Sequence, residues 1–506
     1  MSGNYRPRRR YGAPGKAKAP DAKASGAKGP AASGAAPAAA RRDSARRANL
    51  PRRTAYDVLA AVRDRAAYAN LLLPKLLAER QLTGRDAALA TELAYGTLRG
   101  QGSYDAVLAA CSDRPLDKLD PPVVDILRLG THQLLNTRVG AHAAVATSVD
   151  LAKAVVGPRV SGYVNAVLRR VATRDLEAWL AIVAPDPGAD PDGYLAIRYS
   201  HPRWIVAAYR DALGDVAGAE LAAALEAGNA RPRVTLATLP GGPPREEVMP
   251  ADAEPGRWSP YAFTLPSGDP APLVAAGAAA VQDEGSQLAA IAVSSVPLAH
   301  RPDDQPEHWL DLCAGPGGKA RLLYGLAAAR GARLTAAELH PHRAALVTET
   351  LTRAARQLAG KPPPFDVLVA DGTSPPWAAG TFDRVLVDVP CSGLGALRRR
   401  PEARWRKSAA DLKELTALQR DLLRAALDAV RPGGVVGYVT CSPVPAETRD
   451  VVTDVTGSRP DVEILDAPAV LSDVPGTRSP AALFAQLWPH RHGTDAIFIA
   501  LLGRTS

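Results

Sequence analysis

Residues 309–319 read Trp309-Leu310-Asp311-Leu312-Cys313-Ala314-Gly315-Pro316-Gly317-Gly318-Lys319, a short apolar segment followed by a glycine-rich loop. We interpret the apolar segment, Trp309–Leu312, as a buried strand and the loop as the turn into a helix. Comparable apolar segments follow at Leu334–Ala337, Phe365–Ala370, Val385–Val389, Val435–Val439 and Ile497–Leu501, with helical stretches between them, notably Leu412–Val430. Strands that alternate with helices predict an α/β fold with a doubly wound parallel sheet.

Ligands of such a sheet bind beyond the carboxyl ends of its strands. The loop lets the backbone approach a ligand closely, but its spacing matches neither the dinucleotide fingerprint nor a Walker A loop, which disfavours a dinucleotide dehydrogenase. Glu338, at the next strand end, suits the hydroxyls of a ribose, and Asp371, one strand further on, suits an adenine amino group. Together they predict an adenosyl ligand.

Two short cysteine motifs also follow strands, Asp388-Val389-Pro390-Cys391-Ser392-Gly393 and Thr440-Cys441-Ser442-Pro443. A lone cysteine in an apolar stretch is usually a core residue, which is our interpretation of Cys111, and we expect Cys313 to pack within its loop. Cys391 and Cys441 have small neighbours at the functional edge of the sheet, so we expect at least one of them to be catalytic. On thiol chemistry alone the two are equivalent.

A thiol, an acid and a methyl-donor site together point to alkylation of a pyrimidine. Carbon 5 of cytosine is a poor nucleophile until a thiolate adds to carbon 6 and breaks the aromaticity of the ring. An acid that protonates or hydrogen-bonds ring nitrogen 3 eases this attack, a role that suits Asp388. The base must leave its stack to reach such a pocket.

The charge of the chain is concentrated at its N-terminus. The first 53 residues hold 14 Lys/Arg and only Asp21 and Asp43 as acids, a net of +12, so the rest of the chain is net −3 within the total of +9. Residues 1–50 have few large apolar side chains, which predicts a disordered basic tail. This tail either adds non-specific attraction to phosphate or serves only as a solubilising segment.

Helical periodicity dominates residues 51–178, for example in Ala55, Leu59, Val62 and Ala66, and predicts an all-α domain. Proline and glycine between 185 and 193 indicate a linker. Residues 190–268 mix helical and strand-like segments, which predicts a small α+β connecting module, and residues 269–506 form the predicted catalytic α/β domain. There is no apolar segment of bilayer length and no secretory signal, and four scattered cysteines favour a reducing, cytoplasmic setting.

The catalytic half resembles the Sun family of S-adenosylmethionine-dependent RNA 5-methylcytosine methyltransferases. The resemblance lies in residues 282–287 (Gln-Asp-Glu-Gly-Ser-Gln), 311–319, 388–395, 431–434 (Arg-Pro-Gly-Gly) and 440–442. It implies a Rossmann-like fold, S-adenosylmethionine as methyl donor, no metal, Cys441 as the nucleophile, Cys391 in product release and Asp388 as the acid. The donor contacts that it implies are Cys313, Ala314, Gly315, Pro316, Gly317, Gly318, Lys319, Glu338, Asp371 and Asp388.

Two segments depart from the family pattern. Pro445-Ala446-Glu447-Thr448 stands where Pro-Glu-Glu-Asn is common, and Asp495-Ala496-Ile497-Phe498 stands where Asp-Gly-Phe-Phe is common. We expect neither to touch the thiol or donor motifs.

Residues 56–59, 141–145 and 164–169 resemble the NusB-like helical RNA-binding domain. Its fusion to this catalytic domain is similar to the subfamily that modifies 16S rRNA at position 967, which implies 16S rRNA or a small-subunit assembly intermediate as the partner. We expect a monomer. A tRNA cytosine-5 methyltransferase is the alternative enzyme, and a non-catalytic RNA-binding antitermination factor is the alternative of another class.

Overall fold

The computed structural model describes residues 49–266, 269–298, 305–360, 362–481 and 483–505. The predicted disordered tail, residues 1–50, lies almost wholly outside these ranges. None of the helices in the described ranges is both long and apolar enough to cross a membrane.

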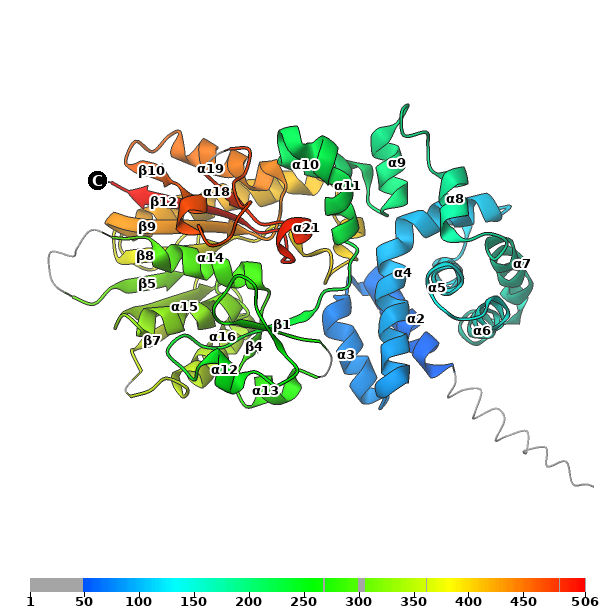
Figure 1. Ribbon diagram of the computed structural model, residues 1–506, viewed down its shortest axis with the longest axis horizontal. Coiled ribbons are helices and arrows are strands. Elements are labelled where there is room, and N and C mark those ends of the chain that lie inside the picture. Colours follow the sequence, from blue (N-terminus) through cyan, green and yellow to red (C-terminus); the bar gives the residue numbers. More distant parts are fainter. Residues whose placement is uncertain (1–48, 267–268, 299–304, 361, 482, 506) are drawn as a thin grey trace, which may run out of the picture. The chain divides into compact units, whose positions relative to one another are not determined.

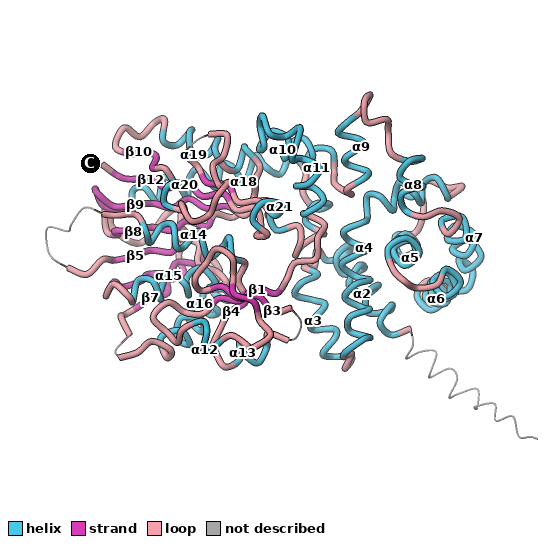
Figure 2. Tube along the Cα trace, viewed as in Figure 1, coloured by secondary structure: helices cyan, strands magenta, loops and turns pink. Residues whose placement is uncertain are grey.

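The first part of the described chain is helical, as predicted, and Figure 2 shows only helices and loops there. Its helices are α2 (Leu50–Arg65), α3 (Ala69–Glu79), α4 (Gly84–Cys111), α5 (Pro121–Asn136), α6 (Ala141–Val155), α7 (Ser161–Val171) and α8 (Leu176–Val183). Helix α5 begins at a proline pair, where a missing backbone N–H costs nothing. Its apolar face, with Val123, Ile126 and Leu127, packs into one core that also buries Cys111.

A mixed segment follows. It contains α9 (Pro191–Arg198), α10 (Arg203–Leu213) and α11 (Ala217–Ala227), then β1 (Val234–Ala237), α12 (Arg245–Val248), β2 (Glu254–Pro255), β3 (Ala262–Leu265), α13 (Ala271–Ala275) and β4 (Ala280–Val281). The strands form an antiparallel sheet in the order β2-β3-β1-β4. Strand β4 belongs to this sheet although it lies past residue 268, where the sequence places the end of the connecting module.

A larger sheet forms the last part of the chain. Its strands run in the order β10-β12-β9-β8-β5-β6-β7, and β11 pairs with β12. Their bounds are β5 (His308–Asp311), β6 (Arg333–Glu338), β7 (Phe365–Val369), β8 (Phe382–Asp388), β9 (Val430–Thr440), β10 (Val462–Leu465), β11 (Ala485–Gln486) and β12 (Phe498–Arg504). All six strands predicted from the sequence are present. The prediction of a parallel sheet holds for β9-β8-β5-β6-β7, whereas β10, β11 and β12 pair antiparallel, so the sheet is mixed.

Helices cover both faces of this sheet (Figure 1). Because side chains alternate along a strand, Trp309 packs on one face with α14 (Glu284–Ser295), α15 (Gly318–Ala328) and α16 (Pro341–Ala355), whereas Leu310 packs on the other with α18 (Leu412–Ala429) and α19 (Arg449–Thr456). Each buried leucine or valine contributes about 1.5–3 kcal/mol by leaving water. The short helices α17 (Ala403–Arg406), α20 (Ala467–Val470) and α21 (Pro489–His492) lie in the connections.

The parallel strands all end at the same edge of the sheet. Asp311, Glu338 and Asp388 are the last residues of β5, β6 and β8, and Cys441 directly follows β9. The register pairs Asp311 with Leu386 and Asp388 with Val439, so these strand ends are neighbours. The chemically active residues are therefore gathered at one edge by the topology alone.

Candidate active site

The glycine loop joins β5 to α15 and packs tightly against Glu338. The amide of Gly315 donates a hydrogen bond to Glu338 Oε2 at 3.1 Å, and a Cβ added at Gly315 would lie 2.1 Å from that oxygen. Gly317 has φ of +113°, a conformation that favours glycine. Both glycines are therefore required by the fold of the loop.

Glu338 is buried, and its carboxylate organises the loop. It accepts from Gly315 N–H and from the His340 amide at 3.0 Å, and Arg343 Nη1 lies 3.5 Å away. Arg343 Nη2 in turn donates to the Gly315 carbonyl at 2.5 Å. Glu338 is thus fixed beside the loop, at the place where the sequence predicts ribose recognition.

Asp311 offers a place for a cation beside the loop. Its side chain is fully buried, and neither carboxylate oxygen has a hydrogen-bond partner of good geometry among the described residues. Burial, together with the nearby charge of Asp388, raises the pKa of Asp311 to about 7. The expected donor carries a sulfonium and an ammonium group, so an unpaired buried acid next to a glycine cradle fits it.

Asp371 lies apart from these contacts. It is exposed two residues past β7, and its side chain accepts from the Thr373 amide at 2.9 Å and from the Thr373 hydroxyl at 2.7 Å. The structure does not bring it into contact with the loop or the thiols. Its predicted contact with an adenine amino group stays a prediction.

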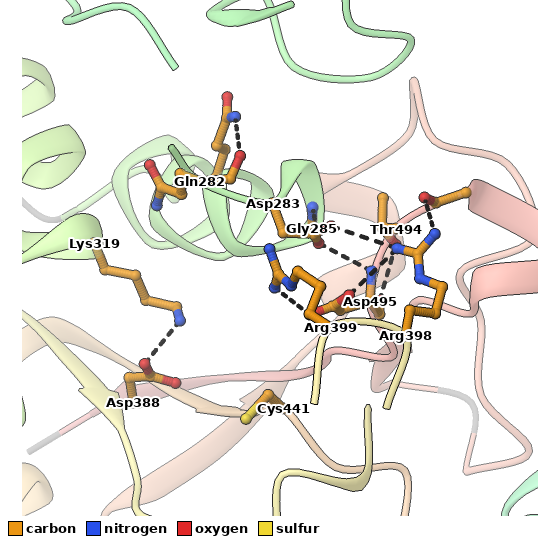
Figure 3. A network of polar contacts seen from close by, with 12 residues as sticks. Gln282, Asp283, Gly285, Lys319, Asp388, Arg398, Arg399, Cys441, Thr494 and Asp495 are labelled. Atoms are coloured by element: carbon orange, nitrogen blue, oxygen red, sulfur yellow. Dashed lines mark hydrogen bonds and ion pairs between the residues drawn. The ribbon is translucent and has the colours of Figure 1, made fainter. Parts of the chain in front are cut away.

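Lys319 reaches from the first turn of α15 to the end of β8. Its Nζ lies 2.7 Å from Asp388 Oδ2 (Figure 3). Burial lowers the pKa of Lys319, but the attraction of Asp388 outweighs it and the pKa is raised overall. The family resemblance implies that both residues contact the donor, and in the structure they form an ion pair that faces Cys441.

The two motif cysteines meet at this edge. Their Sγ atoms are 3.2 Å apart, although 50 residues separate them in the sequence. The Cys391 pKa is raised well above its usual value, because its thiol hydrogen-bonds to Cys441 and is buried, and Glu447 and Asp388 add negative charge. The Cys441 pKa is lowered, because it receives this hydrogen bond and lies near the cations of Lys319 and Arg400. The protein thus makes two equal thiols unequal.

Glu447 joins the two cysteine loops, a role that the sequence alone does not predict. This buried carboxylate accepts from the Ser392 amide at 2.7 Å, from the Ser392 hydroxyl at 2.5 Å and from the Ser442 hydroxyl at 2.7 Å. Ser392 and Ser442 are the residues that follow the two cysteines. The expectation that segment 445–448 does not touch the thiol motifs is therefore wrong.

The segment 495–498 also contacts the thiol loops, contrary to expectation. The Ala496 amide donates to the Gly395 carbonyl at 3.0 Å, and the Gly395 amide donates to the Cys441 carbonyl at 2.8 Å. Asp495, beside Ala496, pairs with Arg398 and Arg399. Neither set of contacts can be predicted from the sequence, because residues in loops show no periodic pattern that would reveal their distant partners.

Comparison with known proteins assigns both halves of the chain to known families. Residues 298–503 match the family model described as 16S rRNA methyltransferase RsmB/F, and residues 49–173 match the NusB family. The chain is 50% identical over 456 residues to a methyltransferase of Mycobacterium tuberculosis strain H37Rv, covering 90% of this chain and 96% of the relative.

A further relative and a solved structure of the same fold are also similar to the chain. Ribosomal RNA small subunit methyltransferase B of Pseudomonas putida is 32% identical over 462 residues, covering 89% of this chain and 98% of the relative. The crystal structure of PH0851 shares the fold, with a TM-score of 0.71 at 21% identity, over 90% of this chain and 98% of that one. The chain therefore belongs to the RsmB/F (Sun) family of methyltransferases and carries an N-terminal NusB domain.

Proposed function

We propose that the protein methylates carbon 5 of a cytidine in 16S rRNA, of the position 967 type, with S-adenosylmethionine as the methyl donor. The observation that carries this proposal is the pair of thiols 3.2 Å apart, beside the Lys319–Asp388 ion pair. Many methyltransferases share the glycine loop, but only an unreactive ring carbon needs a thiol nucleophile.

The residues divide the chemistry among themselves. The Cys441 thiolate adds to carbon 6 of the ring and forms a carbon–sulfur bond, while the Lys319–Asp388 pair supplies a proton or hydrogen bond at ring nitrogen 3. This makes carbon 5 electron-rich. When bound, S-adenosylmethionine supplies an electrophilic methyl group. After the methyl group has bonded to carbon 5, a general base takes the carbon 5 proton, the electron pair of that C–H bond forms the carbon 5–carbon 6 double bond, and the carbon–sulfur bond breaks. The protonated thiol of Cys391 lies next to Cys441 and assists by donating a hydrogen bond as Cys441 leaves as a thiolate.

The glycine loop, Glu338, Asp371 and Asp388 hold the donor in this proposal. Support comes from the Gly315 cradle against Glu338 and from the unpaired acid of Asp311. No residue of the proposed mechanism requires a metal.

The substrate proposal rests on the N-terminal half. A NusB domain at 49–173 and a relative named for the small ribosomal subunit both favour ribosomal RNA. We propose residues 51–178 as the RNA-binding domain, 190–268 as the connecting RNA-binding module and 269–506 as the catalytic domain, in a monomer that acts in the cytoplasm.

Bisulfite sequencing of rRNA and tRNA from a deletion strain tests the proposal. We expect one cytidine of 16S rRNA to lose its protection from conversion, and to regain it with a plasmid that carries the wild type but not Cys441→Ala. If a tRNA cytidine lost its protection instead, tRNA would be the substrate. Unchanged protection at every site would refute the enzymatic proposal and leave the non-catalytic RNA-binding alternative.

A further inference from the structure

Two adjacent arginines, Arg398 and Arg399, lie beside Cys441 and are held by two buried acids (Figure 3). Arg398 donates to the Gly493 carbonyl at 2.8 Å and lies 3.3 Å from Asp495 Oδ1 and 3.5 Å from Asp283 Oδ2. Arg399 Nη2 pairs with the other Asp495 oxygen. Asp283 also accepts from the Asp495 amide at 3.0 Å, which fixes the acid that holds both arginines.

The two guanidinium groups are used differently. The Arg398 side chain is 10% exposed, and its Nη atoms interact with the Gly493 carbonyl and the Asp495 carboxylate. The Arg399 side chain is 37% exposed, and among the described residues its Nε and Nη1 have no hydrogen-bond partner. Arg398 is therefore a structural support, whereas Arg399 keeps free donors that are held in place by Asp495.

These free donors are on the side of the thiol site. In Figure 3 Arg399 lies between Arg398 and the group formed by Lys319, Asp388 and Cys441. Burial lowers the Arg399 pKa, but Asp495 and Asp283 outweigh it, and the charge of Cys441 adds to the increase, so the pKa is raised. Gly395 ties the Arg399 loop directly to the Cys441 carbonyl and to Ala496, next to Asp495. The guanidinium is thus both charged and fixed relative to the nucleophile.

We propose that Arg399 binds an acceptor oxygen of the nucleotide that sits over Cys441, with Asp495 as its positioning residue. The inference rests on the proposed function. When a thiolate adds to carbon 6, the displaced electron pair is delocalised toward nitrogen 3 and the carbonyl oxygen at carbon 2. A fixed cation next to that oxygen stabilises the adduct more than the free base, which is how an enzyme lowers a barrier. The 5′ phosphate of the same nucleotide is the other source of such an oxygen.

The test uses the full-length protein and an rRNA fragment with the target cytidine, made in three forms: unmodified, with 2-thiocytidine at the target, and with a methylphosphonate on its 5′ side. Arg399→Gln removes the charge, Arg399→Lys keeps it, and Asp495→Asn loosens its support. Arg353→Gln, on the exposed face of α16, is the matched control. Thermal unfolding of each variant establishes that it is folded.

On unmodified RNA, Arg399→Gln should lower kcat/KM by about 10- to 100-fold, the loss expected for one hydrogen bond to a charged group. Arg399→Lys and Asp495→Asn should lower kcat/KM by less than Arg399→Gln does, and the control should leave kcat/KM unchanged. If the ring oxygen is the partner, 2-thiocytidine should slow the wild type but not slow Arg399→Gln further. If the phosphate is the partner, the methylphosphonate should show that pattern instead.

If each analogue slowed Arg399→Gln by the same factor by which it slows the wild type, Arg399 would act through neither oxygen. That result would overturn the proposal. Wild-type activity in Arg399→Gln would overturn it as well. If Arg399→Gln does not fold, the same comparison is made with Arg399→Lys. Failure of the wild type to methylate any cytidine would refute the proposed function itself, so the two failures are distinct.

Discussion

Replacing Glu447 by alanine should destabilise the fold and separate the two thiols. The carboxylate accepts four hydrogen bonds at 2.5–3.2 Å from Ser392, Ser442 and Gln419. In the variant the serine hydroxyls, 3.2 Å apart, can bond each other, and Gln419 keeps its bond to the Pro390 carbonyl. The Ser392 amide and one of the two hydroxyl hydrogens are then left buried without an acceptor.

The size of the destabilisation by Glu447→Ala follows from the hydrogen bonds that are lost. Each orphaned buried donor costs at least about 1 kcal/mol, and the cavity left by the side chain adds to the two of them, so we expect a loss of about 3 kcal/mol in the free energy of unfolding. This corresponds to a fall in Tm of roughly 6–12 °C for a domain of about 230 residues. Glu447→Gln keeps the shape and an acceptor oxygen, so its loss should be about 1 kcal/mol.

Activity should fall further than stability predicts. Ser392 and Ser442 are adjacent in sequence to the cysteines, so without the Glu447 carboxylate the thiols shift, and a displacement of about 1 Å can cost 100-fold in rate. Differential scanning fluorimetry and transfer of a labelled methyl group to RNA measure the two effects, with Glu414→Ala on the exposed side of α18 as control. If Glu447→Ala matched this control in both Tm and rate, the Glu447 carboxylate would have no such role.

Three further predictions address the thiols, the donor site and the tail. Cys441→Ala should abolish turnover and the covalent RNA adduct, whereas Cys391→Ala should accumulate an adduct that survives a denaturing gel; the opposite pattern would reverse the two roles. Because the folded-state pKa of Asp311 is raised, from 3.8 to about 7, its contribution to stability is full below about pH 4 and is lost as the pH rises to about 7. Asp311→Asn should therefore reduce, by roughly 2–3 kcal/mol, the unfolding free energy that the protein without donor loses between pH 5 and pH 8, and so narrow its difference in Tm, while weakening donor binding; an unchanged difference would show that Asp311 ionises normally. Removing residues 1–48 should weaken RNA binding and flatten its salt dependence, and an unchanged slope would favour a purely solubilising tail.

The sequence predicts the central sheet well because its strands are short, apolar and regularly spaced. Leu310 and Val385 are fully buried neighbours, as a strand with both faces covered requires. No sequence pattern distinguishes a parallel from an antiparallel strand that is buried on both faces. The apolar segment of β12 therefore predicted a strand but not its antiparallel direction. Strand β10, whose residues are only partly buried, escaped detection because it lacks a continuous apolar run.

The candidate site likewise contains residues that the sequence predicts and residues that it does not. Asp388, Cys391 and Cys441 could be predicted because each stands at or just past a strand end, where a parallel sheet gathers its functional residues. Glu447 and Asp495 could not, because they act through partners 55 and 97 positions away that only the folded chain brings near. A single sequence contains no record of such pairs of polar residues.

The unequal thiols are the point at which fold and proposed mechanism depend on each other. A nucleophile must be a thiolate near neutral pH, and a group that assists its departure must keep a proton. The hydrogen bond between the two thiols is the main cause that raises the Cys391 pKa and lowers the Cys441 pKa, while Glu447 adds negative charge near Cys391 and Lys319 adds positive charge near Cys441. By joining the two loops, Glu447 keeps the thiols in the contact that leaves Cys391 as the proton-bearing group and Cys441 as the better nucleophile. Exchanging the two cysteine roles would require reversing this hydrogen bond against the charges of Glu447 and Lys319.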